Sequence, residues 1–389
     1  MTPPADRNDP TDAARARRIL LVTSFPFPGS TGSPLHAMLL TRAMAARGHE
    51  ITVLRYGGRR APRVDRASWH GINVSTVPMA SWPRFLLRTL REMRPSVVWT
   101  HGGFGLLVAM PFARARGIPI LHEAHALPGP ARAGASLRTR TVFRAEAQIE
   151  LRAPRLADGV IALSERMADA MVRAGIRRER LSVSYPPVDL AAVRGEPRAP
   201  AASAPIVAYV GNFWFYQGVS LLLEAIPLVL AERPDVRFQL VGGSPEDLDA
   251  NARERLRAAG DSVAVVPRID PDDVPAVLRG ADVLVIPRPD IPINRTTARK
   301  LGEYLASGRI LVATDVADHR RLIEERSCGI VVRCDAADLA AGLLRAVQDR
   351  AASGALARRA VEVAEEVFSL DRAVSHRERR IAELVGEGS

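Results

Sequence analysis

The hydrophobic positions of this chain fall into short continuous runs that are separated by longer amphipathic segments. The runs are rich in Val, Ile and Leu, so each predicts a strand that is apolar on both faces, as in parallel sheets covered by helices. The expected strands are residues 19–23, 51–54, 97–100, 118–121 and 160–163, followed by 206–210, 238–241, 263–266, 283–286, 310–314 and 330–332. Because strands and helices alternate in two series, the pattern predicts an α/β fold of two Rossmann-like domains.

A segment without periodicity lies between the two series and predicts the domain boundaries. We expect a disordered tail over 1–17, an N-terminal domain over 18–192, a Pro- and Ala-rich linker over 193–205, a C-terminal domain over 206–367 and a final helical segment over 368–389. The tail lacks the apolar core of a signal peptide. Since no run of about 18 apolar residues occurs, no transmembrane helix is expected.

Charge and cysteine content bear on the binding partners and the cellular compartment that we expect. Residues 1–195 hold 29 Arg against 14 acidic residues, whereas the remainder holds 25 basic and 29 acidic residues. This asymmetry favours an anionic membrane surface or an acidic acceptor, although an arginine-rich solvated surface is an equally open interpretation, and no nucleic-acid partner is expected. Residues 82–94 combine an apolar stripe with four arginines, which fits an interfacial helix or an ordinary surface helix. The two cysteines indicate no disulfide framework, which favours the cytoplasm, with peripheral contact to the inner membrane face left open.

In the first half, candidate polar residues follow the expected strands. Gly32 lies in a Gly-containing loop before a helix, where backbone amides favour an anion, although a tight turn explains it nearly as well. The sequence His122-Glu-Ala-His125 is one residue shorter than the zinc motif H-E-x-x-H, so the rings would not share a helical face and no metal is expected. We expect His125 to form hydrogen bonds in the cleft; a purely structural histidine is the alternative.

The second half carries the stronger signals. Residues 211–218 join a strand to a helix with a glycine at each end, which is typical of a loop that holds phosphate. Lys300 is the only lysine among 54 basic residues, and a helix is expected to open near Arg295. Three-residue spacing would place Thr297, Lys300 and Glu303 on one face, where Lys300 could neutralise a diphosphate and Glu303 could bind ribose. The alternative is a surface salt bridge between Lys300 and Glu303.

Taken in order, these segments resemble glycosyltransferase family 4, whose members are retaining enzymes of the two-domain GT-B fold. The segments that carry the resemblance are 47–53, 157–164 with Glu150 upstream, 184–189, 241–243, 300–308 and 367–370. The resemblance implies a C-terminal helix that crosses back to the N-terminal domain, a cleft between the domains and a donor held mainly by the second domain. It also implies that His125 acts on the transferred sugar. Together with the arguments from the residues themselves, it leads us to expect ten residues at the donor: Gly32, Gly211, Asn212, Gln217, Gly243, Arg295, Thr296, Thr297, Lys300 and Glu303.

Two departures from the family pattern concern charge. The family often has an arginine and a lysine where this chain has Asn212 and Gln217, and the partner of Glu303 in its Glu-x7-Glu pair is Arg295 here. Arg295, Arg299 and Lys300 are therefore the cations expected to restore charge against the diphosphate.

The resemblance implies a retaining, metal-independent glycosyltransferase without a cofactor. It would move a sugar from a nucleotide sugar, with UDP favoured and GDP open, to a hydroxyl acceptor of a polysaccharide, glycolipid or other glycoconjugate that is lipid-linked or anionic. Two alternatives stay open at this point. They are a sugar-nucleotide epimerase of GT-B-like fold and a non-catalytic, glycosyltransferase-like partner subunit.

Overall fold

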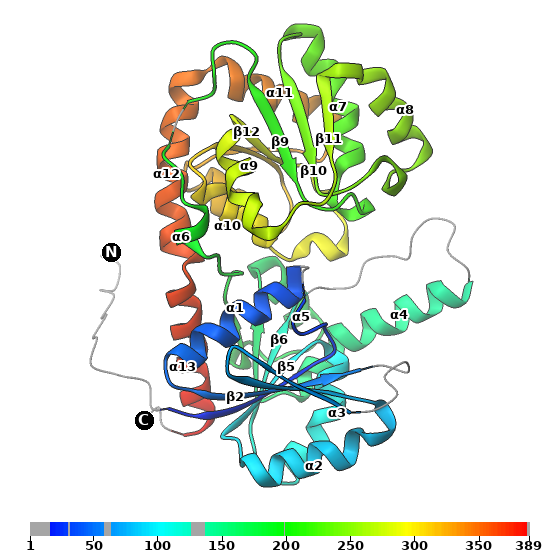
Figure 1. The fold of residues 1–389 in the computed structure, drawn as a ribbon, viewed down its shortest axis with the longest axis vertical. Helices are drawn as coiled ribbons and strands as arrows, with labels where there is room; N and C mark the ends of the chain where they lie inside the picture. Colours follow the sequence, from blue (N-terminus) through cyan, green and yellow to red (C-terminus); the bar gives the residue numbers. More distant parts are fainter. Residues whose placement is uncertain (1–15, 30–31, 58–63, 126–136, 198, 387–389) are drawn as a thin grey trace.

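Two α/β domains lie one above the other in the computed structural model, which describes residues 16–29, 32–57, 64–125, 137–197 and 199–386 (Figure 1). Each domain is a sheet of mainly parallel strands with helices packed on both faces. The fold class predicted from the sequence is confirmed. Apart from its last two residues, the tail expected over 1–17 lies outside the described residues.

The N-terminal domain contains an eight-stranded sheet in the order β3-β4-β2-β1-β5-β6-β7-β8, and among these described strands only β3 and β4 pair antiparallel. The strands are β1 Arg18–Thr23, β2 Glu50–Tyr56, β3 Asp65–Trp69, β4 Ile72–Val77, β5 Val97–His101, β6 Ile120–Ala124, β7 Gly159–Ala162 and β8 Leu181–Val183. The helices are α1 Gly32–Ala46, α2 Trp82–Met93, α3 Gly103–Arg114, α4 Leu137–Arg152, α5 Glu165–Arg173 and α6 Leu190–Val193. Sequence patterns missed β3, β4 and β8. Strand β3 is an exposed edge strand, and polar residues interrupt the apolar positions of β4 and β8.

The C-terminal domain contains a six-stranded, fully parallel sheet in the order β11-β10-β9-β12-β13-β14. Its strands are β9 Ile206–Val210, β10 Arg237–Val241, β11 Val263–Val266, β12 Val283–Ile286, β13 Ile310–Thr314 and β14 Ile330–Val332. Its helices are α7 Val219–Glu232, α8 Ala250–Ala259, α9 Val274–Gly280, α10 Arg299–Ala306, α11 Ala336–Gln348 and α12 Arg350–Phe368. All six strands overlap the expected apolar runs. The central strands β12 and β13 are buried at every residue, and a strand that is buried on both faces needs an apolar sequence.

The last helix, α13 Leu370–Leu384, leaves the C-terminal domain and packs on the N-terminal domain beside α1 (Figure 1). Glu378 of α13 lies 2.5 Å from a guanidinium nitrogen of Arg47 and 3.0 Å from Nε2 of His49. The buried side chains Val374 and Ile381 join the apolar core on that face of the N-terminal sheet. The structure thus confirms that the C-terminal helix crosses back to the first domain.

A second connection between the domains forms at the facing edges of the two sheets. Asp318, which follows β13, accepts hydrogen bonds from the backbone amides of Glu165 and Arg166 at 2.6 and 3.0 Å and from the hydroxyl of Tyr185 at 2.9 Å. The amides belong to the first turn of α5, where a carboxylate is favoured by the helix dipole. These contacts bring the carboxyl ends of both sets of strands toward each other.

Helix α2 contains the arginine-rich segment that fits an interfacial helix. Its apolar side chains Trp82, Leu86, Leu90 and Met93 are buried in the core of the N-terminal domain. They are therefore not available to enter a lipid surface, and the ordinary surface-helix interpretation describes the apolar stripe. No helix within the described ranges has both the length and the hydrophobicity of a membrane span.

Candidate active site

Two glycines of the loop between β9 and α7 lie so close to neighbouring atoms that a side chain at either position would collide with them. Gly211 has a φ of 154°, and a Cβ atom there would lie 2.5 Å from Nζ of Lys300. A Cβ atom on Gly218 would lie 1.8 Å from the carbonyl oxygen of Pro287, at the end of β12. Glycine at both positions lets this loop lie against α10 on one side and the β12 end on the other.

Lys300, in the first turn of α10, holds its ammonium group over this loop. Its Nζ atom donates to Oε1 of Gln217 at 3.0 Å and to the hydroxyl of Tyr209 at 3.2 Å, and lies 4.3 Å from the centroid of the Tyr209 ring. No carboxylate within the described part of the chain pairs with it, since Glu303 pairs with Arg299 instead. Burial, reinforced by the nearby charge of Arg288, lowers the pKa of Lys300 to about 7. The expected alternative of a Lys300–Glu303 salt bridge is therefore wrong.

The helix that carries Lys300 begins later than the sequence pattern predicts. Residues Pro292–Arg295 form a short 3-10 turn, and α10 starts only at Arg299. Thr297 therefore precedes the helix and does not share a helical face with Lys300 and Glu303. It is nevertheless buried, and no partner among the described residues satisfies its hydroxyl. Buried hydroxyl groups normally find a partner, so Thr297 remains a candidate for a ligand contact.

The other candidate donor residues of this domain lie in different surroundings. Asn212 uses its Oδ1 atom to accept the Trp214 amide at 3.2 Å, and its carbonyl oxygen accepts the Tyr209 hydroxyl at 2.6 Å. Gly243 lies under the ring of Phe213, since a Cβ atom there would be 2.4 Å from a ring carbon. Its small size thus serves packing in the loop. The hydroxyl of Thr296 faces the sulfur of Met167 in the other domain at 3.5 Å.

Arg295 lies at the domain boundary. Its side chain is exposed and lines a cavity of about 220 Å³ with residues of α4 and α5, among them Gln148 and Arg173. Its carbonyl oxygen accepts a hydrogen bond from the hydroxyl of Ser164, the N-cap of α5. This cation thus faces a space between the domains, while Lys300 lies over the β9–α7 loop.

Sequence patterns missed Arg288, which lies two residues after the end of the apolar strand β12. The side chain is 6% exposed, its guanidinium carbon lies 6.0 Å from the centroid of the Tyr216 ring, and one terminal nitrogen donates to the carbonyl of Thr296 at 3.2 Å. Burial lowers the pKa of Arg288 to about 10, so it stays charged at neutral pH. Its position after a strand could have identified it from the sequence, because ligands bind beyond the carboxyl ends of parallel strands.

The candidate residue His125 of the N-terminal domain lies beside a buried glutamate. Glu123, near the end of β6, pairs with Nε and a terminal nitrogen of Arg377 at 3.0 and 2.9 Å and with Nε2 of His36. His125 lies two residues further on; its Nε2 atom is 3.8 Å from Glu123 and its ring packs edge-on against Phe25. Spacing along the chain does not connect His36 and Arg377 to this cluster, because they come from the distant helices α1 and α13.

The histidines of this cluster are neutral. Burial lowers the pKa of His125 well below its usual range, and His101 and His36 lower it further. Burial by itself would raise the pKa of Glu123, but Arg377 and His36 hold it well below its usual range, so the carboxylate is ionised. Nε2 of His125 has no partner among the described residues although it is buried. It can therefore accept or donate one hydrogen bond to a ligand.

His36, Glu123 and His125 are also the described residues that come closest to a metal-ligand set, with their ligand atoms within 4.8 Å of one another. Neutral imidazoles and a carboxylate are suitable ligands for zinc. However, Arg377 already pairs with both oxygens of this carboxylate, and its positive charge opposes that of a metal ion. We therefore keep the prediction that the site needs no metal.

The remaining features bear less on the candidate site. Gly32 is the first residue of α1, and a Cβ atom there would meet nothing within 4 Å, so sterics alone do not require glycine. Trp214 and Phe215, within the β9–α7 loop, are 54% and 44% exposed.

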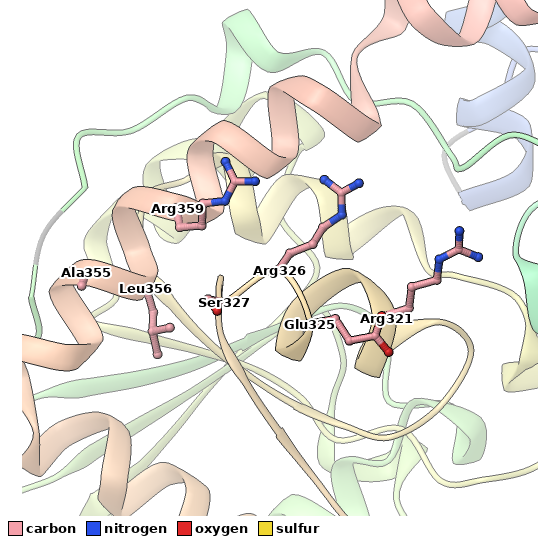
Figure 2. A pocket seen from close by; sticks show the side chains of 7 residues that line it. All are labelled: Arg321, Glu325, Arg326, Ser327, Ala355, Leu356 and Arg359. Carbon is pink, nitrogen blue, oxygen red and sulfur yellow. The ribbon is translucent and has the colours of Figure 1, made fainter. Parts of the chain in front are cut away.

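A cavity of about 830 Å³ lies between α12 and the turn that follows β13, as Figure 2 shows. Two arginines on its lining, Arg326 and Arg359, pair with Glu366, so they offer no free charge to an anion.

Comparison with known proteins gives a consistent result for both domains. Residues 30–192 match the family described as Glycosyltransferase Family 4, and residues 204–349 match Glycosyl transferases group 1. A curated relative is the phosphatidylinositol N-acetylglucosaminyltransferase gpi3 subunit of Schizosaccharomyces pombe, at 24% identity over 76% of this chain and 65% of that protein. Another is the alpha-D-kanosaminyltransferase of Streptomyces kanamyceticus, at 25% identity over 75% of this chain and 84% of that protein. The alignment with the Schizosaccharomyces protein thus spans less than two thirds of that protein's length.

Solved structures agree on the fold. Sucrose-phosphate synthase from Thermosynechococcus elongatus superposes with a TM-score of 0.75 at 20% identity, covering 95% of this chain and 100% of that one. The Anabaena protein HepE, solved in complex with UDP, superposes with a TM-score of 0.75 at 17% identity, covering 94% of this chain and 100% of that one. At these identities the likeness concerns the fold alone.

Proposed function

The chain belongs to glycosyltransferase family 4, and from that premise we propose that it is a retaining enzyme that uses a nucleoside-diphosphate sugar, preferably of UDP, to glycosylate a hydroxyl acceptor. The observation that carries the proposal is the ammonium of Lys300, which lies over the β9–α7 loop without an acidic partner among the described residues. A diphosphate would supply the missing negative charge. The preference for UDP draws on HepE, which was solved with UDP and with UDP-glucose.

In the proposed reaction the bond between the anomeric carbon and the β-phosphate oxygen breaks, and a bond to the acceptor oxygen forms on the same face of the sugar. The leaving nucleoside diphosphate takes the electron pair of the broken bond and accepts the acceptor's proton. Lys300 would stabilise the charge that develops on the leaving phosphate, which is the usual role of a fixed cation in such a site. Neutral His125, with an Nε2 atom that no described residue satisfies, would orient a hydroxyl of the transferred sugar.

The acceptor side belongs to the N-terminal domain in this proposal. The basic excess of residues 1–195 favours an anionic or lipid-linked acceptor, and a peripheral contact with the inner membrane face is part of the proposal. Because the apolar face of α2 is buried, such a contact would rest on charge and not on insertion.

A screen of nucleotide sugars with the purified protein tests the function. Calorimetry measures binding of UDP and GDP, and mass spectrometry measures donor hydrolysis and transfer to hydroxyl compounds. NMR of the product then shows whether the anomeric configuration is retained. Conversion of the donor into an epimer would favour the epimerase alternative, and binding without hydrolysis or transfer would favour a non-catalytic partner protein. Absence of binding to every nucleoside diphosphate would contradict the proposal.

A further inference from the structure

Arg288 is a buried cation that lacks a counterion within the described part of the chain. Its Nε atom is buried and has no hydrogen-bond partner among the described residues, and none of their carboxylates forms an ion pair with its guanidinium group. Other arginines of the same domain do have such partners, as Arg299 does with Glu303 and Arg333 with Asp338. Since an unpaired buried charge is costly, a buried guanidinium of this kind indicates an anion that binds beside it.

Arg288 lies next to the β9–α7 loop. A Cβ atom on Gly218 would lie 3.1 Å from the Cα atom of Arg288, so the backbone of Arg288 lies against the Gly218 end of the loop. The guanidinium carbon lies on the side of the Tyr216 ring in the same loop, 6.0 Å from the ring centroid. Arg288 therefore lies at the Gly218 end of the loop, while the ammonium group of Lys300 lies beside both Gly211 and Gln217.

The two cations also affect each other. The charge of Arg288 is the second cause, after burial, of the lowered pKa of Lys300. Two neighbouring cations that lack acidic partners repel each other until an anion of matching charge lies between or beside them. A nucleoside diphosphate bound as a sugar ester carries two negative charges on its phosphates, so its charge balances that of the pair.

We propose that Arg288 is the second diphosphate-binding cation of this protein, and that Arg288 and Lys300 together supply the charge absent from positions 212 and 217. The inference rests on the proposed function and deepens it. Arg299 is neutralised by Glu303, and Arg295 faces the cavity beside α4 and α5, so neither is the second cation. The planar guanidinium of Arg288 can present two parallel donors to one phosphate, which an ammonium cannot do.

Calorimetric binding of UDP, UMP and uridine to the full-length protein tests this assignment. Arg288→Gln keeps an amide donor for the Thr296 carbonyl and removes the charge, so UDP binding should weaken by about tenfold or more. The loss should be smaller for UMP and absent for uridine, because uridine carries no phosphate. Arg333→Gln is the matched control, since Arg333 follows β14 at the same edge of the sheet but pairs with Asp338. It should bind UDP like the wild type.

A second variant separates a lost contact from a damaged fold. Arg288→Gln combined with Gln217→Lys places a cation back beside the same phosphate, and it should recover much of the affinity for UDP. Equal losses for UDP, UMP and uridine, or wild-type UDP binding by Arg288→Gln, would overturn the inference while the proposed function stands. If the wild-type protein bound no nucleoside diphosphate, the inference and the proposed function would both be contradicted. Should Arg288→Gln unfold, as circular dichroism would show, Arg288→Lys carries the same comparison with a smaller expected loss.

Discussion

Replacing Lys300 by methionine removes the ammonium group and keeps most of the side-chain volume. In the structure this group donates to Gln217 and Tyr209, both neutral, and has no acidic partner among the described residues. The substitution therefore leaves none of the described carboxylates without its partner. Its main expected effect is weaker binding of an anion. A hydrogen bond to a charged group contributes about 1.5–3 kcal/mol, so the affinity for UDP should fall roughly 10- to 140-fold.

The pH dependence gives a second, independent readout of the same group. The pKa of Lys300 is lowered to about 7 in the free protein by burial, and a bound diphosphate would raise it again. Above pH 7 the free protein loses this proton and must take it up on binding. The association constant should therefore fall with rising pH, by up to about tenfold per pH unit, until the pKa of the complex is reached. UDP contributes little to this slope, because its phosphates are already ionised above about pH 7.

Isothermal titration calorimetry of UDP between pH 6.5 and 9 measures both effects. Lys300→Met should show weak binding and a flat pH profile over this range. Arg333→Met serves as the control, because it removes a cation at the same sheet edge that is paired with Asp338. A folded Lys300→Met protein that binds UDP with wild-type affinity would refute the assignment of Lys300 to the diphosphate. A wild-type affinity that is constant from pH 7 to 9 would refute the lowered pKa as a feature of binding.

Three further predictions concern the N-terminal domain. His125→Ala should lower the turnover rate far more than it weakens UDP binding, because the neutral imidazole would act on the sugar; an active variant would return His125 to a structural role. Initial rates should be unchanged in excess EDTA, because Glu123 is already paired with Arg377. A loss of activity that Mg²⁺ or Mn²⁺ restores would contradict this prediction. Vesicle co-sedimentation should show binding to anionic lipid that high salt removes, because only charge is available on α2; no binding at low salt would favour a soluble acceptor.

The sequence by itself determined most of the C-terminal domain and one residue of its candidate site. The central strands β9, β12 and β13 of that sheet are largely or fully buried, so their apolar runs mark them directly. The exposed strand β3 lacks such a run and was missed for the same physical reason. Lys300 could be singled out because its side chain differs chemically from the arginines used everywhere else in this chain.

Only the tertiary structure decided which charged groups lie together. Spacing along the chain left a pair of Lys300 with Glu303 open as an alternative, yet Arg299 binds that carboxylate and leaves the lysine available to an anion. The cluster around Glu123 joins side chains that are more than 80 and 250 residues away along the chain, His36 and Arg377. Local periodicity reports whether a residue is buried, but the partner of a buried charge is set by packing between distant segments, and sequence spacing does not encode it.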